Sequence, residues 1–300
     1  MSLLLKDILN IAETRFKDAG CLTPRLDAEI LFCHLIKRDR SYLFLHYGDE
    51  VTEKTCEEYF KLIDLRASGK PVQYIIGYQE FMGLKFIVNE SVLIPRQDTE
   101  LLVETAIDEL RKMKIPIGGL DVLDLCCGSG AIAVSLAYHM KGSKIKIMAS
   151  DVSAQAIEVA KSNAKNNGVS DMIDFKVGDL FGPFPKNRKG KGKKQFNLII
   201  SNPPYIKTDD LSTLMREVRE HEPMLALDGG DDGLDFYRRI INEAHSYLKP
   251  GGVLLLEIGY DQGQSVPDLI RNTGYYNEPK VLKDLAGHNR VVLTEAKHQN

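Results

Sequence analysis

The sequence predicts an α/β fold in which helices cover both faces of a mostly parallel sheet. From about residue 98 onward, near-continuous apolar strands alternate with amphipathic helices, which is the pattern of a parallel sheet buried on both faces. The preceding N-terminal part reads as helical, and 300 residues are too many for one typical domain. We therefore expect an N-terminal helical domain, a β-hairpin linker and an α/β domain, at residues 1–72, 73–95 and 96–300.

The N-terminal segment predicts a small helical bundle. Apolar residues recur at helical spacing before Gly20 stops the first run. Thr23 followed by Pro24 is typical of an N-cap with proline at the first helical position. A third helix is expected after Thr52, ending at Ser68 and Gly69. Such a bundle serves packing or the docking of a partner.

The next segment changes to β-branched and aromatic residues. Residues 70–95 are punctuated by Gly77 and Gly83, which predicts one or two hairpins between the domains. The alternating strands and helices follow. Strands are expected at 120–127, 144–151, 172–179, 196–201 and 251–259, and helices at 99–113, 130–140, 153–168 and 233–252. The last two strands, at 279–287 and 289–296, have no helix between them and predict an antiparallel hairpin at the sheet edge.

Composition indicates a globular protein without an obvious charged partner. Apolar residues make up 43%, charged residues 27%, and the net charge is −3, which gives no whole-chain argument for nucleic-acid binding. Five cysteines without C-x-x-C spacing favour free thiols in a reducing compartment. We find no signal peptide or membrane-spanning run, so a cytoplasmic protein is expected. The basic stretch 186–194 is a solvated insertion or a phosphate-contacting patch.

Three consecutive strands end in groups suited to a ligand. The first leads into a glycine turn with Gly128 and Gly130, which allows close approach to backbone and to a helix N-terminus. Asp151 ends the second strand, 23 positions after Gly128, where a carboxylate can accept from ribose hydroxyls. Asp179 ends the third and could accept from an adenine amine. Either aspartate alone could instead be a helix cap or a solvated turn residue. Together they indicate a cofactor that contains a nucleoside.

The cofactor that fits best is S-adenosylmethionine. The turn lacks the third glycine of a dinucleotide fingerprint and the lysine of a P-loop, so NAD and ATP are disfavoured. Cys126 and Cys127 lie where the ligand would pass. Without a nearby histidine or metal-ligand pattern, they are interpreted as small packing residues.

The fourth strand ends abruptly at Asn202-Pro203-Pro204-Tyr205. Prolines cannot extend a strand ladder, but their stiffness can hold neighbouring acceptors in place. An amide or aromatic amine is a poor nucleophile because its lone pair is delocalised. The Asn202 side-chain oxygen and the Pro203 carbonyl could grip its two N–H groups. Tyr205 could lie flat against the planar substrate group and tolerate the sulfonium charge.

These residues and several longer segments resemble the HemK/PrmC family, the protein-(glutamine-N5) methyltransferases of peptide chain release factors. N-P-P-Y alone is shared with adenine-N6 methyltransferases, whereas "LIPRQDTELLVE" and "EPMLALDGGDDGLDF" are more particular. The resemblance covers the whole chain. It implies a Rossmann-like class I fold with a seven-stranded sheet, and a helical N-terminal domain that docks the release factor.

The resemblance also implies an activity and a site. The enzyme would transfer methyl from S-adenosylmethionine to the glutamine of the Gly-Gly-Gln motif, leaving S-adenosylhomocysteine. A monomer is expected, with no metal, no membrane and no nucleic-acid substrate. Asn202, Pro203, Pro204 and Tyr205 would hold the glutamine, with Asn202, Pro203 and Tyr205 catalytic. The implied cofactor contacts are Cys126, Cys127, Gly128, Ser129, Gly130, Asp151, Val152, Asp179, Leu180 and Asn202.

Some positions depart from the family pattern or stay ambiguous. The family turn usually begins with glycine where this chain has Cys126, so that residue must tolerate the same backbone. Leu180 replaces an aromatic residue of some relatives. Arg96 and Glu100 either brace a substrate lid or cap the first helix of the α/β domain. The acidic "GGDDGLD" fails the EF-hand spacing and is interpreted as a loop.

Two other functions remain open at this stage. An adenine-N6 methyltransferase on DNA or RNA would need a basic, aromatic-lined cleft and extrusion of the base. A release-factor-binding module without catalysis would retain only a vestigial pocket, against which the intact Asn202 motif argues.

Overall fold

The computed structural model describes residues 3–184 and 195–297. The basic stretch 186–194 lies outside the described residues. Contacts divide the chain into two compact units, Met1–Tyr78 with Leu214–Glu222, and Gln79–Thr213 with Pro223–Asn300. The expected boundaries at residues 72 and 95 differ from this division, because the hairpin strands beyond Tyr78 belong to the second unit.

The first unit is a helical bundle, as the sequence predicts, but it has more helices than expected. Thr52 caps α4 by accepting a hydrogen bond from the Thr55 N–H, and Pro24 begins α2. Thr23 occupies the N-cap position without a side-chain cap, since its hydroxyl donates to Asp27 instead. The elements are β1 (Leu3–Leu4), α1 (Leu5–Asp18), α2 (Pro24–Ile36), α3 (Arg40–His46), β2 (Glu50–Val51), α4 (Glu53–Ala67), α5 (Val72–Ile76) and α9 (Arg216–His221).

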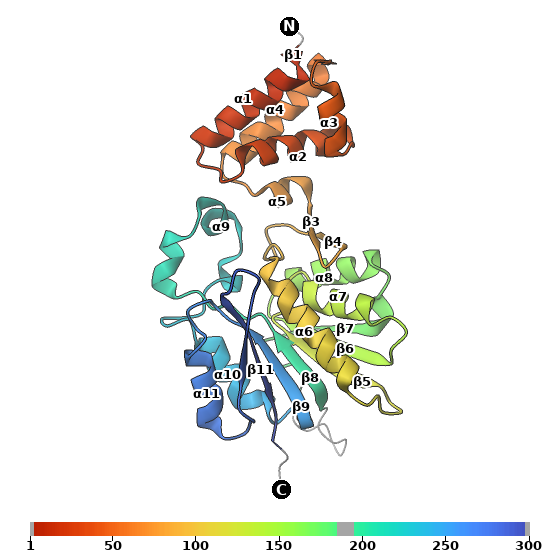
Figure 1. Cartoon of the computed structure of the whole chain (residues 1–300), viewed down its shortest axis with the longest axis vertical. Coiled ribbons are helices and arrows are strands. Elements are labelled where there is room, and N and C mark those ends of the chain that lie inside the picture. The colour runs from red at the N-terminus through yellow and green to blue at the C-terminus, as the bar shows by residue number, and fades with distance from the viewer. Residues whose placement is uncertain (1–2, 185–194, 298–300) are drawn as a thin grey trace. The chain divides into compact units, whose positions relative to one another are not determined.

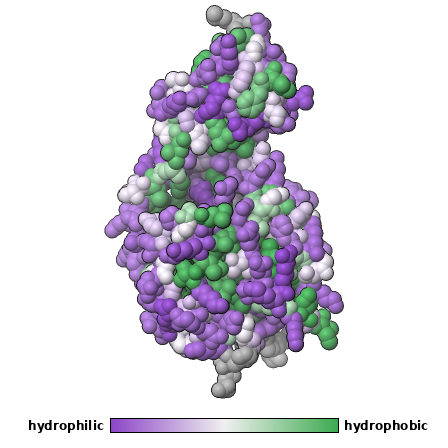
Figure 2. Space-filling model, in the orientation of Figure 1, coloured by the Kyte–Doolittle hydropathy of each residue, from purple (hydrophilic) through white to green (hydrophobic). Residues whose placement is uncertain are grey.

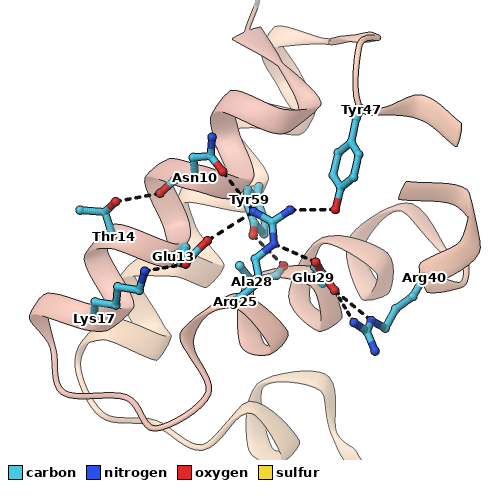
Figure 3. A network of polar contacts seen from close by, with 10 residues as sticks. All are labelled: Asn10, Glu13, Thr14, Lys17, Arg25, Ala28, Glu29, Arg40, Tyr47 and Tyr59. Carbon is cyan, nitrogen blue, oxygen red and sulfur yellow. Dashed lines mark hydrogen bonds and ion pairs between the residues drawn. The ribbon is translucent and has the colours of Figure 1, made fainter. Parts of the chain in front are cut away.

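A network of polar contacts joins the helices of this unit (Figure 3). The Arg25 guanidinium donates to Glu29 at 2.8 Å and to the Tyr47 hydroxyl at 2.8 Å. It also donates to Asn10 on α1 at 3.1 Å. Arg40 binds the second Glu29 oxygen at 2.6 Å. Glu29 is only 4% exposed, and the two arginines satisfy a carboxylate that would otherwise be costly to bury.

A second buried arginine holds a distant segment of the chain in the first unit. Arg66 is 4% exposed and donates to Asp27 at 2.8 Å. Its Nη2 pairs with Glu217 of α9 at 2.7 Å. Val218, on the same short helix, is also buried. The segment Leu214–Glu222 therefore belongs to this unit, although it lies in sequence between two elements of the second unit.

The second unit contains the seven-stranded sheet that the sequence predicts, in the order β10-β11-β9-β8-β5-β6-β7 (Figure 1). Strands β7, β6, β5, β8 and β9 pair in parallel. Strand β11 is antiparallel to β9 and β10, which confirms the expected edge hairpin. The strands are β5 (Leu120–Leu125), β6 (Ile145–Asp151), β7 (Ile173–Val177), β8 (Phe196–Ser201), β9 (Leu248–Glu257), β10 (Lys280–Lys283) and β11 (Asn289–Glu295).

Helices cover both faces of this sheet and bury one apolar core on each (Figure 1). One core includes residues of α6 (Asp98–Lys112), α7 (Ala131–His139) and α8 (Ala154–Asn166). The other includes residues of α10 (Asp235–Ala244) and α11 (Ser265–Thr273). Helix α11 was not expected from the sequence. The two cores fix the strands between rigid layers, so the strand ends at one edge are held in place.

The hairpin of β3 (Tyr78–Phe81) and β4 (Leu84–Ile87) packs into the first of these cores. Glu100 accepts a hydrogen bond from the Met82 N–H at 2.7 Å, and Asn163 bonds both backbone groups of Ile87. Glu100 thus fixes the hairpin turn. The expectation that strands begin at residue 70 was wrong, because Val72–Ile76 forms the helix α5.

The viewed surface is mostly hydrophilic, with hydrophobic patches on the second unit (Figure 2). Exposed apolar side chains of that unit include Met224 and Leu225, at 45% and 57% exposure. They belong to η3 (Met224–Ala226), a short 3₁₀ helix. Within the described ranges, we find no helix with the length and apolar character that crossing a membrane requires.

Candidate active site

The register of the sheet brings the predicted ligand groups to one edge. Leu125 of β5 is opposite Ser150 of β6 and Ser201 of β8. The residues that follow these strands therefore emerge side by side at the carboxyl ends. In open α/β sheets this is where ligands bind. The glycine turn, Asp151 and Asn202 are thus neighbours in space, as their positions in the sequence predict.

A cavity of about 310 Å³ opens at this edge, within the size range of small-molecule sites. All of its lining residues belong to the second unit. Most residues expected to contact the cofactor line it, namely Cys126, Gly128, Asp151, Val152, Asp179, Leu180 and Asn202. Three others from the turn, Cys127, Ser129 and Gly130, are buried and do not line it.

The glycine turn has the backbone that close ligand approach requires. Gly128 lies at φ +51°, and a Cβ added there would meet nothing within 4 Å. Because Gly128 borders the cavity, a side chain at that position would occupy ligand space. Gly130 lies at φ +78°, and its Cβ would come within 3.0 Å of the Ala160 side chain. Gly130 therefore permits α7 to pack against α8, while Gly128 leaves room for a ligand.

Asp151 supports the turn and faces the cavity at once. Its two oxygens accept hydrogen bonds from the Gly128 N–H at 2.8 Å and the Ser153 N–H at 2.9 Å. Burial raises the pKa of this carboxyl, and these backbone donors oppose the rise. Each oxygen keeps a further lone pair that can accept from a hydroxyl. The arrangement fits the ribose of a nucleoside, which is the role that the sequence predicts.

At the end of the third strand, Asp179 has a protein partner, whereas the sequence led us to expect a carboxylate that accepts from an adenine amine. The Asp179 carboxylate pairs with Arg239 of α10 and is about half exposed. Leu180 lines the cavity in a left-handed backbone, φ 45°. The aromatic side chain at the cavity is Phe236, also from α10. The aromatic lining of the cavity therefore comes from α10 rather than from the end of the third strand.

The Asn202 motif begins where pairing of β8 with its neighbours ends, at Ser201. Asn202 and Pro204 line the cavity, whereas Pro203 and Tyr205 do not. Pro203 is buried, and Tyr205 is partly buried against the second core. Burial raises the pKa of Tyr205 to about 12, so its hydroxyl is neutral at ordinary pH.

A glycine loop clamps the backbone of Tyr205. A Cβ on Gly229 would lie 2.7 Å from the Tyr205 Cα, and one on Gly233 would lie 2.4 Å from the Tyr205 carbonyl oxygen. The buried Gln262 donates to the carbonyls of Tyr205 and Gly233 at 3.2 and 3.1 Å. The "GGDDGLD" segment is thus a loop, as expected, whose glycines permit contact with the Asn202 motif.

Comparison with known proteins follows the same division of the chain. Residues 7–77 match the PrmC N-terminal domain, and residues 118–292 match a methyltransferase domain. The release factor glutamine methyltransferase of Moorella thermoacetica is 41% identical over 289 residues, covering 96% of this chain and 97% of the relative. That of Clostridium acetobutylicum is 38% identical over 292 residues, covering 96% and 97%.

The chain belongs to the release factor glutamine methyltransferase family.

Solved structures show the same fold at lower similarity. The catalytic domain of hMettl16 in complex with MAT2A 3'UTR hairpin 6 matches with a TM-score of 0.55 at 14% identity, covering 84% of this chain and 86% of that one. This likeness concerns the fold alone. The class I methyltransferase fold expected from the sequence is thereby confirmed for this member of the release factor glutamine methyltransferase family.

Several residues of the site were not expected from the sequence. Two sequence segments contain many of these residues and could have indicated them. The segment "NESVL" contains the lining residues 90–93, and "EPMLAL" contains Pro223, Leu225 and Ala226. Thr99 contacts Asn202 but was not predicted as a site residue. Only Arg96 and Glu100, on either side of it, were considered. Further lining residues that were not predicted are Glu90, Ser91, Val92, Leu93, Ser150, Ser153, Gln155, Ala156, Gly178, Pro223, Leu225, Ala226 and Phe236.

Burial keeps the two cysteines of the glycine turn in their protonated form. All five cysteines are free thiols. Burial raises the pKa of Cys126 and Cys127 far above the ordinary value, so both stay protonated and neither is a nucleophile. Within residues 3–184 and 195–297, no cluster of histidine, cysteine and carboxylate side chains is arranged to hold a metal.

Proposed function

We propose that this protein transfers the methyl group of S-adenosylmethionine to the side-chain nitrogen of the glutamine in the Gly-Gly-Gln motif of a peptide chain release factor. The observation that carries this proposal is Asn202 at the cavity beside the glycine turn and Asp151. The full-length similarity to release factor glutamine methyltransferases supports the amide substrate over a nucleobase or a purely binding role.

The cavity residues account for cofactor binding. S-adenosylmethionine supplies, when bound, a methyl group on a positively charged sulfur. Asp151 accepts from the ribose, Phe236 and Leu180 face the base, and Gly128 leaves room beside the backbone. Cys126, Val152 and Asp179 complete this wall. Cys127, Ser129 and Gly130 act through the shape of the turn.

The Asn202 motif accounts for substrate activation. The Asn202 oxygen and the Pro203 carbonyl accept the two N–H groups of the glutamine, which turns the nitrogen lone pair toward the methyl group. The nitrogen–carbon bond forms as the carbon–sulfur bond breaks, and one N–H proton leaves to solvent. Pro204 stiffens the loop, and Tyr205 borders the planar amide. The precise positioning of both acceptors provides the rate advantage.

The partner and setting follow from this substrate. The N-terminal unit docks the release factor, and the enzyme acts as a monomer in the cytoplasm, where release factors meet ribosomes. The exposed Met224 and Leu225 lie beside the cavity and provide apolar contact for the substrate loop.

Methyl transfer to a purified release factor tests the proposal. Labelled S-adenosylmethionine should place one methyl group on the Gly-Gly-Gln glutamine, located by peptide mapping. Asn202→Ala should lower the rate by about a thousandfold, because an acceptor and its positioning are lost. Cofactor affinity measured by calorimetry should stay within a few fold.

Asn242→Ala is the matched control, since Asn242 is exposed on α10. It should retain the wild-type rate. Undiminished turnover in Asn202→Ala would reject the two-acceptor grip, and label on DNA or RNA rather than on the release factor would reject the proposed substrate.

A further inference from the structure

A buried carboxylate lies next to Asn202 and has no role in the chemistry described so far. Glu257 ends β9 and is 1% exposed. The parallel register pairs Ser201 with Leu256. Asn202 and Glu257, the next residue along each chain segment, therefore lie side by side at the same level of the sheet. A buried, unpaired charge is costly in a protein interior. Its presence beside the reacting group therefore needs a physical reason.

Glu257 accepts hydrogen bonds from the side chains of Thr99 and Asn202. The Asn202 Nδ2 also donates to the Thr99 Oγ1 at 3.2 Å. The three side chains form a closed set in which Thr99 accepts from Asn202 and donates to Glu257. The second Glu257 oxygen, Oε2, has no hydrogen-bond partner in the described part of the chain.

This set decides which end of the Asn202 carboxamide faces the cavity. A carboxamide has an accepting oxygen and a donating nitrogen of nearly the same shape. An ionised carboxylate only accepts, so it draws the Asn202 nitrogen toward itself. The oxygen is then directed to the opposite side, where the substrate N–H groups require an acceptor. A protonated Glu257 could instead donate to the Asn202 oxygen and stabilise the reversed orientation of the carboxamide. The Asn202 NH₂ group would then face the NH₂ group of the substrate glutamine, and neither could accept a hydrogen bond from the other.

The surroundings place this ionisation close to neutral pH. Burial raises the pKa of Glu257 to about 7, and Thr99, Arg290 and Asn202 oppose the rise while Asp98 adds to it. Arg290, on β11, forms an ion pair with Asp98 at the start of α6 at 2.9 Å. Tyr205 and Tyr237 also interact with Glu257, and burial raises both of their pKa values, so both stay neutral in this pH range; Arg96 and Asp261 are further charges near these tyrosines.

We propose that Glu257 is a positioning residue, which in its ionised form and together with Thr99 holds the Asn202 carboxamide with its oxygen toward the substrate. Methyl transfer then requires a charged Glu257. This inference rests on the proposed function of Asn202 and adds an acid-sensitive orienting group to it.

The pH dependence of kcat, measured with the full chain, saturating cofactor and purified release factor, tests the inference. Glu257 is neutral below its pKa, so the wild-type kcat should fall about tenfold per pH unit below about pH 7 and be level above it. Glu257→Gln keeps the shape but is neutral at every pH and, like a protonated carboxyl, can donate to the Asn202 oxygen. Its kcat should therefore be level across the same range and at least about tenfold below the wild-type plateau.

Thr99 provides a second, independent pair of variants. Thr99→Val removes the hydroxyl that donates to the charged carboxylate, so the midpoint of the pH profile should move upward and the plateau kcat should fall about tenfold. Thr99→Ser keeps the hydroxyl and should keep the wild-type midpoint. Cofactor affinity by calorimetry should not change in any of these variants.

The outcomes separate this inference from the proposed function. A wild-type kcat that is level from about pH 5.5 to about pH 8.5 overturns it, as does a Glu257→Gln variant that keeps the acid limb. An equal midpoint in the two Thr99 variants also counts against it. If the wild-type protein methylates no release factor at any pH, the proposed function fails instead.

Discussion

Cys126 shows how a residue with a side chain adapts to the left-handed backbone of the glycine turn. It lies in a left-handed backbone at φ 59°, a conformation that costs a residue with a side chain about 1–2 kcal/mol. Its neighbour Cys127 is 6% exposed and packs into the core beneath the helices α6, α7 and α8. The demand on Cys126 is thus its backbone conformation, whereas the demand on Cys127 is packing in the core.

Replacing each cysteine by glycine should separate these demands. Cys126→Gly should change the free energy of unfolding by less than about 1 kcal/mol, because relief of backbone strain offsets lost packing and glycine entropy. Cys127→Gly should cost roughly 2 kcal/mol, because no strain is relieved and a buried side chain is removed. Urea denaturation measures both. Equal costs at the two positions would contradict this account of the turn.

Residues that follow or end a strand could be predicted from the sequence. Residues that orient the side chains at those strand ends could not. Asn202 and Asp151 could be predicted because each follows an apolar run and ends at a known edge of the sheet. Thr99 and Glu257 could not, since they act through Asn202 and contact it only in the fold. Thr99 lies 103 residues from Asn202, and nothing in local pattern records such a pairing.

At the scale of elements, the loop around Gly229 and Gly233 holds the backbone of the Asn202 segment in place. It lies between η3 and α10 and meets the backbone of Tyr205 at distances that exclude a side chain. The buried Gln262 fastens the two segments together. The glycines of this loop are therefore explained by close approach rather than by metal binding.

A methyl group at Gly229 should disturb this contact. Gly229→Ala would place its Cβ 2.7 Å from the Tyr205 Cα, so the Asn202 segment must shift. We expect kcat to fall at least about tenfold and the free energy of unfolding to fall by about 1–3 kcal/mol.

Gly118→Ala is the matched control, because neither glycine has a left-handed backbone and the Gly118 Cβ would meet nothing within 4 Å. It should leave both kcat and stability unchanged in steady-state assays and urea titrations. A normal rate in Gly229→Ala would show that the loop does not position the Asn202 segment.

Long apolar strands could be predicted from sequence, whereas short helices could not. The strands β5, β6 and β8 are rich in apolar residues and lie at the expected positions. The helix α5 is rich in β-branched and aromatic residues, which favour strands. It is nevertheless helical because Pro71 and Gly77 bound it and Val72 packs into the core of the helical unit. Tertiary packing overrides propensity there.

At the scale of the whole molecule, cofactor binding belongs to one unit. Every residue that lines the cavity lies within Gln79–Thr213 or Pro223–Asn300. A chain of residues 79–300 should therefore bind S-adenosylmethionine with a dissociation constant within about tenfold of the full chain, measured by calorimetry. A folded fragment that does not bind it would show that the first unit completes the pocket.

The same fragment should lose order in one internal segment. Without Arg66, Glu217 has lost its partner and Val218 its packing surface. Hydrogen exchange at residues 214–222 should become fast in the fragment and stay slow in the full chain, while β5 and β8 remain protected in both.

The placement of α9 in the first unit limits how modular this protein can be. A chimera that replaced only its first 78 residues by those of another protein would bring in a foreign partner for Glu217 and leave nine native residues, 214–222, without the surface they fit. Recombination at one junction is thus disfavoured. The leading helices and this internal stretch must be inherited, or redesigned, as a single set.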